Sequence, residues 1–125
     1  MINLRATDIR AFIPAKDFEK SLEFYVGLGF TLVYSDANLA LLEMANQRFY
    51  LQRYYVKQWA DNSMLHLSVA DAAHCYRQVS EMLADGRFPE ARVTPPKQES
   101  YGALVTYVWD PCGVLLHLAQ WTTES

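Results

Sequence analysis

Hydrophobic and polar residues alternate in the first part of the chain and then change to a helical spacing. Residues 7–14 alternate as a half-buried strand does. From Phe18 onward the apolar positions follow a helical period, and Asp17 before them is a typical N-cap. The pattern stops at Gly27, so we predict a helix of about ten residues. Three strand-like runs follow, at residues 30–35, 39–44 and 49–55, separated by predicted hairpin turns at 36–38 and 45–48.

The same order of elements returns in the second part of the chain. Residues 64–70 alternate again, Asp71 is placed as a second N-cap, and residues 72–83 have helical spacing. Further strands are predicted at residues 91–94, 103–109 and 114–121, with a loop at 95–102 and an Asp-Pro-Cys-Gly turn at 110–113. An offset of 54 residues, from Pro14 to Ser68, superposes strand on strand and helix on helix. The chain is therefore predicted to contain two copies of a βαβββ unit.

The composition and length indicate one domain spanning residues 1–125. Of its 125 residues, 51% are hydrophobic, which suffices for a sizeable core. Within this domain we predict a first module at 7–55, a linker at 56–63 and a second module at 64–121.

The net charge of −3 argues against a nucleic-acid surface and favours a cationic or neutral ligand. No apolar run reaches the ~18 residues of a membrane span, and the first residues lack a signal-peptide core, so we expect a cytoplasmic protein without membrane partners. The two cysteines, Cys75 and Cys112, are too few for a disulfide scaffold and are expected to be reduced thiols. Neither has a predicted base beside it, so no catalytic residue is proposed.

The two βαβββ modules, the segment AKDFEKSLEFYVGLGF at residues 15–30 and the late Asp-Pro-Cys-Gly turn together resemble the vicinal oxygen chelate superfamily. That group includes glyoxalase I, extradiol dioxygenases, fosfomycin resistance enzymes and bleomycin resistance proteins. The resemblance implies an α+β fold in which two βαβββ modules form a cupped, partly open mixed sheet with the helices outside. It also implies a homodimer with ligand sites at the cup mouths or between subunits.

Enzymes of this superfamily hold a divalent metal with His and Glu side chains from the first and last strands of each module. By resemblance these positions fall on Arg10, Met64, His117 and, within one residue, Gln52. Arg cannot release a proton to bind a cation, and Met is a poor ligand for hard metals. A shifted site of His66, His117 and Gln52 would lack a carboxylate. We therefore expect no metal, no cofactor and no enzymatic activity. A metal-dependent lyase, isomerase or dioxygenase with a rearranged site is the alternative.

Strand alternation predicts which side chains line the cup. We expect Ile9, Ala11, Ile13, Leu65, Leu67 and Val69 to face the helices, and Pro14, Met64, Ser68, Leu115 and Ala119 to face the cup. Candidate ligand-binding residues are Arg10, Phe12, Tyr50, Gln52, Tyr54, His66, Tyr101, Trp109, His117 and Trp121. Aromatic members of this set suit flat ring systems. Arg10 is either a clamp for a ligand anion or a structural partner of a carboxylate such as Glu43. His66 and His117 are either a hydrogen-bonded polar pair or ligand contacts.

The resemblance to bleomycin resistance proteins implies a small-molecule binding protein that sequesters its ligand in an aromatic cup at a dimer interface, without chemistry. The expected ligand is a bleomycin-type antibiotic or an aromatic metabolite. Two features differ from those of bleomycin resistance proteins and argue against bleomycin itself as the ligand. Tyr101 precedes Gly102 where such proteins commonly have Trp-Gly, and Arg10 adds a positive charge to the cup. A further alternative is a structural or regulatory protein that uses the cup edges for protein contacts.

Overall fold

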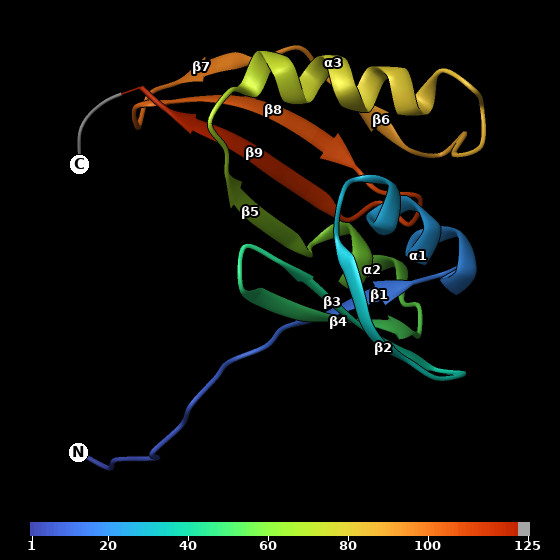
Figure 1. Ribbon diagram of the computed structural model, residues 1–125, viewed down its shortest axis with the longest axis vertical. Helices are drawn as coiled ribbons and strands as arrows, with labels where there is room; N and C mark the ends of the chain where they lie inside the picture. Colours follow the sequence, from blue (N-terminus) through green and yellow to red (C-terminus); the bar gives the residue numbers. More distant parts are fainter. Residues whose placement is uncertain (123–125) are drawn as a thin grey trace.

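A computed structural model describes residues 1–122 of the chain (Figure 1). Its elements in order are β1 (Phe12–Ala15), α1 (Phe18–Gly27), β2 (Thr31–Ser35), β3 (Leu39–Met44), β4 (Gln47–Arg53), α2 (Lys57–Asp61), β5 (Met64–Ser68), α3 (Ala72–Leu83), β6 (Arg92–Val93), β7 (Lys97–Glu99), β8 (Ala103–Trp109) and β9 (Leu115–Trp121). Asp17 and Asp71 cap α1 and α3 as predicted, because each side chain accepts a backbone N–H of the first turn. Within residues 1–122, no helix has the length and apolar character to cross a membrane.

The strands form two mixed sheets, one from each half of the chain. The first has the order β1-β4-β3-β2, and β1 runs parallel to β4. The second has the order β5-β9-β8-β6, with β7 also paired to β8 and β5 parallel to β9. In Figure 1 α3 lies along one face of the second sheet. The predicted α+β fold of two βαβββ-like units is confirmed.

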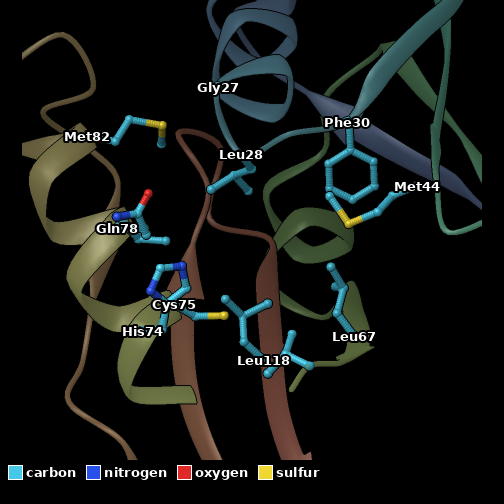
Figure 2. A pocket seen from close by; sticks show the side chains of 12 residues that line it. Gly27, Leu28, Phe30, Met44, Leu67, His74, Cys75, Gln78, Met82 and Leu118 are labelled. Carbon is cyan, nitrogen blue, oxygen red and sulfur yellow. The ribbon is translucent and has the colours of Figure 1, made fainter. Parts of the chain in front are cut away.

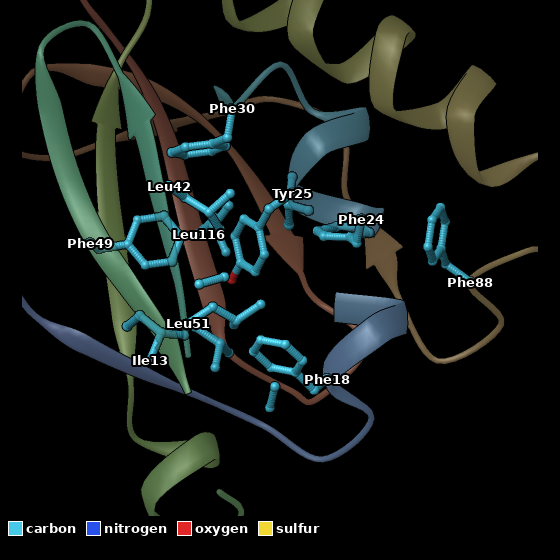
Figure 3. Close-up of a cluster of buried hydrophobic side chains, with 14 of the residues drawn as sticks. Ile13, Phe18, Phe24, Tyr25, Phe30, Leu42, Phe49, Leu51, Phe88 and Leu116 are labelled. Atoms are coloured by element: carbon cyan, nitrogen blue, oxygen red, sulfur yellow. The ribbon is translucent and has the colours of Figure 1, made fainter. Parts of the chain in front are cut away.

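One continuous hydrophobic core joins the two halves (Figure 3). The ring of Tyr25 lies at its centre and makes edge-on contacts with Phe24, Phe30 and Phe49. Phe24 in turn contacts Phe88 from the second half at a ring-centroid distance of 5.3 Å. The aromatic positions predicted as core are all buried: Phe18, Phe24, Tyr25 and Phe30. Tight packing of these rings holds the two sheets in a defined relation.

The turn between β8 and β9 is anchored in this core by Asp110, whose side chain is fully buried. The Tyr25 hydroxyl donates a hydrogen bond of 2.7 Å to Asp110 Oδ2. The backbone N–H groups of Cys112 and Val114 donate to Oδ1 at 2.7 and 3.0 Å. Burial raises the pKa of Asp110, and burial together with the Asp110 charge raises the pKa of Tyr25 well above its usual value. Gly113 has the positive φ that the turn requires, +99°.

The first strand is shorter than predicted, because the expected strand at 7–14 forms only from Phe12 onward. Residues before it extend away from the body of the protein (Figure 1), and Ile9, predicted to face a helix, is 92% exposed. β1 pairs in parallel with β4 only from Phe12, opposite Tyr50, although β4 begins three residues earlier at Gln47, so the chain upstream leaves the sheet before it can pair. Pro14 was predicted to face the cup but is fully buried.

Three connections also differ from the prediction. The turn between β3 and β4 contains only Ala45 and Asn46, both with positive φ, so β4 begins and ends two residues earlier than expected. The predicted linker at 56–63 contains the short helix α2, and the predicted loop at 95–102 contains β7. Short elements of this kind depend on tertiary contacts, so local sequence patterns identify them poorly.

Candidate functional site

The two faces of the second sheet differ in character. On one face Val108, Leu116 and Leu118 join the main core. On the opposite face Ala103, Val105 and Ala119 form a separate small cluster. These three side chains are fully buried, although α3 lies on the other side of the sheet. Larger neighbouring side chains therefore cover them, and we call this surface the open face.

Aromatic and imidazole side chains surround the small residues of the open face. His66 on β5 is the register partner of His117 on β9, with ring centroids 6.2 Å apart. Trp121 lies 5.7 Å from His66 and 6.0 Å from Tyr101, measured between ring centroids. The Trp121 indole N–H also donates a 3.0 Å hydrogen bond to Ser68 Oγ. The two histidine positions predicted from strand alternation thus lie together on one surface.

Tyr107 and Trp109 continue this aromatic surface along β8. Tyr107 lies 5.1 Å from the His117 ring and 6.4 Å from the Trp109 ring. The guanidinium of Arg92 stacks over Trp109 at 3.9 Å from the ring centroid. Trp109 pairs in register with Leu115, which places it on the open face with the other rings. Tyr107 was not among the predicted site residues. It lies two residues before Trp109 on β8, so strand alternation could have placed both side chains on the same face.

His117 is held as a neutral imidazole at neutral pH. Burial lowers its pKa from the usual value, and the neighbouring His66 lowers it further, while the negative charge of Glu99 acts in the opposite direction. Its Nε2 atom lies 3.2 Å from the sulfur of Met64. The two histidine rings stack with their centroids 6.2 Å apart and do not form a hydrogen bond to each other.

Glu99 is a charged residue of the open face that the sequence analysis missed. It lies on β7 opposite Ala103, and register partners in an antiparallel pair share a face. Burial raises the pKa of the Tyr107 hydroxyl most, the charge of Glu99 raises it further, and hydrogen bonding to the Glu99 carboxylate contributes a smaller part. Glu99 lies in a segment that was predicted to be a loop, where the alternation of side chains does not indicate which face a residue occupies. Recognition of β7 as a strand would have placed it on the open face.

The remaining predicted residues gather on the first sheet around Tyr50. Phe12 stacks on the Tyr50 ring at a centroid distance of 4.9 Å. Arg10 donates hydrogen bonds to Tyr50 Oη at 2.8 Å and to Asp8 Oδ2 at 2.6 Å. The hydrogen bond that Arg10 donates to Tyr50 is the main cause of the raised pKa of Arg10. The carboxylate that pairs with Arg10 is Asp8, two residues earlier in the chain, and not Glu43.

The structure thus separates the ten predicted site residues into two groups and one outlier. The first-sheet group consists of Arg10, Phe12, Tyr50 and Gln52. The second-sheet group consists of His66, Tyr101, Trp109, His117 and Trp121. The outlier, Tyr54, follows the end of β4 and packs against Trp59 of α2 at 5.8 Å. Glu43, which was named as an example of a carboxylate near Arg10, forms an ion pair with Arg48 at 2.7 Å.

Two cavities lie near the junction of the halves. One, of about 440 Å³, lies between the β3–β4 hairpin and β5, and is lined by Arg48 and Phe49 on one side and by His66 and Ser68 on the other. The other, of about 320 Å³, is largely apolar. Figure 2 shows its lining, in which side chains of α3 such as Met82 face others from the first half such as Met44. Of the two, only the larger cavity reaches a residue of the second-sheet group.

The donor atoms on the open face do not fit the metal of the superfamily's enzymes. His66, His117 and the Met64 sulfur supply two imidazoles and a thioether, while Gln52 lies on the other sheet. Among residues 1–122, no three His, Cys, Asp or Glu side chains are grouped closely enough to hold a metal ion. Hard divalent ions prefer oxygen ligands, so we assign no metal-dependent step to this surface.

The cysteine thiols are poorly suited to nucleophilic chemistry. Both are free, and burial raises the pKa of Cys112 to about 11 and raises that of the Cys75 thiol as well. The reactive form is the thiolate, which is scarce at neutral pH for thiols with raised pKa values. The open face therefore offers stacking surfaces, hydrogen-bonding groups and one carboxylate, which are the features of a binding site.

Comparison with known proteins gives consistent results. No protein-family model matches the chain. A bleomycin resistance protein of Klebsiella pneumoniae is 26% identical over 110 residues, which cover 86% of this chain and 87% of that protein. The bleomycin resistance determinant encoded on transposon Tn5 is 26% identical, with a TM-score of 0.74 over 94% of this chain and 100% of that chain. A bleomycin-binding protein crystallised with bleomycin is 24% identical, with a TM-score of 0.75 over 95% of this chain and 100% of that chain. As its sequence pattern predicted, the chain has the fold of the glyoxalase/bleomycin resistance/dioxygenase superfamily and is similar in sequence to bleomycin resistance proteins.

Proposed function

We propose that this protein binds a flat-ringed, cationic small molecule of the bleomycin type on the open face of the second sheet and sequesters it without chemical change. The observation that carries the proposal is the floor of Ala103, Val105 and Ala119, surrounded by imidazole, phenol and indole rings. The rings that cover these small residues provide faces on which a planar group can stack. The names of the similar proteins, which bind or confer resistance to bleomycin, support this ligand class.

Exposed aromatic surface provides much of the expected binding energy. Trp121 and Tyr101 are 49% and 51% exposed, so each has a free face for a ligand ring. Each well-placed aromatic contact adds about 0.5–1.5 kcal/mol beyond the burial of its area. Several such contacts, together with burial of a drug-sized ligand, are compatible with a micromolar Kd, which corresponds to about −8 kcal/mol.

The positive charge of Arg10 no longer argues against a cationic ligand. Asp8 forms an ion pair with it at 2.6 Å, and Tyr50 occupies another of its donors. This arrangement makes Arg10 mainly a residue that orders the first-sheet group. Its charge is also largely compensated before any ligand arrives.

The proposal includes a cytoplasmic homodimer in which the first-sheet group of one protomer lies over the open face of the other. Exposed apolar side chains on the first half support a protein contact there, among them the consecutive residues Leu32, Val33 and Tyr34 on the edge strand β2. Exposed apolar side chains on an unpaired edge strand are often covered by another chain. In this arrangement the module at 7–55 of one copy and the module at 64–121 of the other share each site.

A tryptophan fluorescence titration with bleomycin, metal-free and copper-loaded, tests the proposal. We expect saturable quenching with about one drug per chain. Trp121→Phe should lose most of the signal, while Trp59→Phe, which alters a tryptophan packed on Tyr54, should retain it. N-acetyltryptophanamide treated in the same way corrects for absorption by the drug and for quenching by copper. A flat titration of the wild-type protein would contradict the proposal.

A further inference from the structure

The open face contains one buried acceptor atom that accepts no hydrogen bond from residues 1–122. Among the residues that the structure describes, Oε1 of Glu99 is buried and has no hydrogen-bond partner. The Glu99 side chain is only 21% exposed. A buried carboxylate oxygen normally accepts at least one hydrogen bond, because its loss of hydration is costly. An unused acceptor at the edge of a candidate site therefore points to a donor supplied by the ligand.

Lys97 is the nearest positive group to this atom but does not satisfy it. Its Nζ lies 3.6 Å from Oε1, which is beyond hydrogen-bond distance, and its side chain is 75% exposed. An exposed lysine at that distance contributes little, because water screens the pair and the long side chain remains mobile. A ligand cation that donates directly to Oε1 would displace this ammonium group at small cost.

The surroundings of Glu99 suit a cation attached to a flat group. Glu99 pairs with Ala103 of the floor, and Ala103 pairs with Trp121. Its negative charge acts on the Tyr107 hydroxyl and on the His117 imidazole, which places it within electrostatic reach of the rings that line the open face. Aromatic faces attract cations through their negative π-clouds, in addition to the attraction of the carboxylate.

We infer that Glu99 is the residue that selects a cationic nitrogen donor, an amidinium, guanidinium or protonated amine, for the open face. The inference rests on the proposed function and names the charged group that the ligand must carry. A quaternary ammonium lacks the N–H that Oε1 requires. An amidinium supplies both the charge and a planar pair of N–H donors that match a carboxylate.

Benzamidinium and benzamide form a matched pair of probes, because they share a planar shape and differ in charge. Their binding is measured on ¹⁵N-labelled protein from the shift of the Trp121 indole N–H signal. Wild-type protein should bind benzamidinium at least about tenfold more tightly than benzamide. Glu99→Gln keeps the size of the side chain and removes its charge, so it should abolish this preference. Lys97→Met removes the competing ammonium and should strengthen benzamidinium binding roughly twofold to fivefold.

The inference is overturned if the wild-type protein does not distinguish the two probes, or if Glu99→Gln binds benzamidinium as tightly as wild type. Circular dichroism of each variant confirms that the comparison is made between folded proteins. Bleomycin is titrated into the same samples. Glu99-dependent benzamidinium binding without bleomycin binding would remove the antibiotic from the proposed function and leave the role of Glu99 standing. Bleomycin binding that is equal in wild type and Glu99→Gln would do the reverse.

Discussion

Two carboxylates in the second half of the chain, Asp110 and Glu99, each have a buried oxygen atom but differ in their partners. Asp110 is fully buried and accepts three hydrogen bonds, from the Tyr25 hydroxyl and from the backbone of the turn. Glu99 is mostly buried, and its Oε1 accepts none from the described residues. A satisfied buried carboxylate links parts of the fold, whereas an unsatisfied one at the edge of a binding surface lowers stability and remains available to a ligand.

The difference follows from the location of each residue. Asp110 belongs to a tight turn that points into the core, where Tyr25 from the other half of the chain reaches it. Glu99 belongs to a short strand at the border of the open face, beside the floor residue Ala103. An unused acceptor costs about 1–3 kcal/mol, which a protein can tolerate at a site that a ligand completes. Substitutions at the two positions should therefore have opposite consequences for stability and for binding.

The largest expected effect is on stability, from Asp110→Ala. This substitution leaves the backbone donors of Cys112 and Val114 and the Tyr25 hydroxyl without their acceptor. We expect the free energy of unfolding, measured by urea denaturation, to fall by roughly 3 kcal/mol or more. Asp110→Asn retains one acceptor oxygen for the turn and should cost less. A loss below about 1 kcal/mol for the alanine variant would show that Asp110 does not anchor the turn.

Tyr25→Phe separates the tyrosine–aspartate hydrogen bond from the rest of the turn. The ring remains in the core and only the hydroxyl is lost, so we expect the free energy of unfolding to fall by about 1–2 kcal/mol. Ligand binding on the open face should not change, because Tyr25 lies on the core side of the sheets. Unchanged stability would mean that the 2.7 Å contact with Asp110 contributes nothing.

Glu99→Gln should show the opposite pattern. Removing a poorly satisfied charge should leave the free energy of unfolding within about 0.5 kcal/mol of wild type, or raise it slightly. The same variant should lose affinity for cationic ligands, as argued above. Thermal unfolding monitored by circular dichroism measures the change in stability. A destabilisation comparable to that of Asp110→Ala would show that Glu99 stabilises the fold and is not held in reserve for a ligand.

The smallest effect expected is a pH dependence due to His117. Burial and His66 lower its pKa, so the folded protein binds fewer protons than the unfolded chain as the pH falls below about 6.5. Stability from this group is therefore present at neutral pH and declines as the pH falls through that range to the lower folded pKa. Protonation would also place a positive charge beside the cation site near Glu99, so benzamidinium binding should weaken in the same range. His117→Asn should flatten both profiles, and an unchanged profile would exclude His117 as the titrating group.

Much of the fold could be predicted because its signals are local. The caps at Asp17 and Asp71, the spacing of α3 and the turn at 110–113 are each encoded within a few neighbouring residues. Alternation along β5 correctly placed Leu65 and Leu67 toward the core, and Met64, His66 and Ser68 on the exposed face. These predictions needed no knowledge of tertiary contacts.

The features that were missed depend on contacts between distant segments. Tyr25 and Asp110 are 85 residues apart, and nothing near either position indicates the other. Glu99 lies on the open face only because β7 pairs with β8. Alternation in residues 7–11 predicted a strand that does not form, because alternation describes how side chains would lie in a strand and not whether the chain pairs with its neighbour. The division of the site residues between two sheets likewise follows from topology and not from local pattern.

The most direct test of the account is a titration of ¹⁵N-labelled protein with metal-free bleomycin, followed through the indole N–H signals of its three tryptophans. Trp109 and Trp121 belong to the second-sheet group, while Trp59 packs on Tyr54 and serves as an internal reference. The account predicts saturable shifts of the Trp109 and Trp121 signals at about one drug per chain, with little change in Trp59. No saturable shift, or a shift confined to Trp59, would contradict ligand binding on the open face.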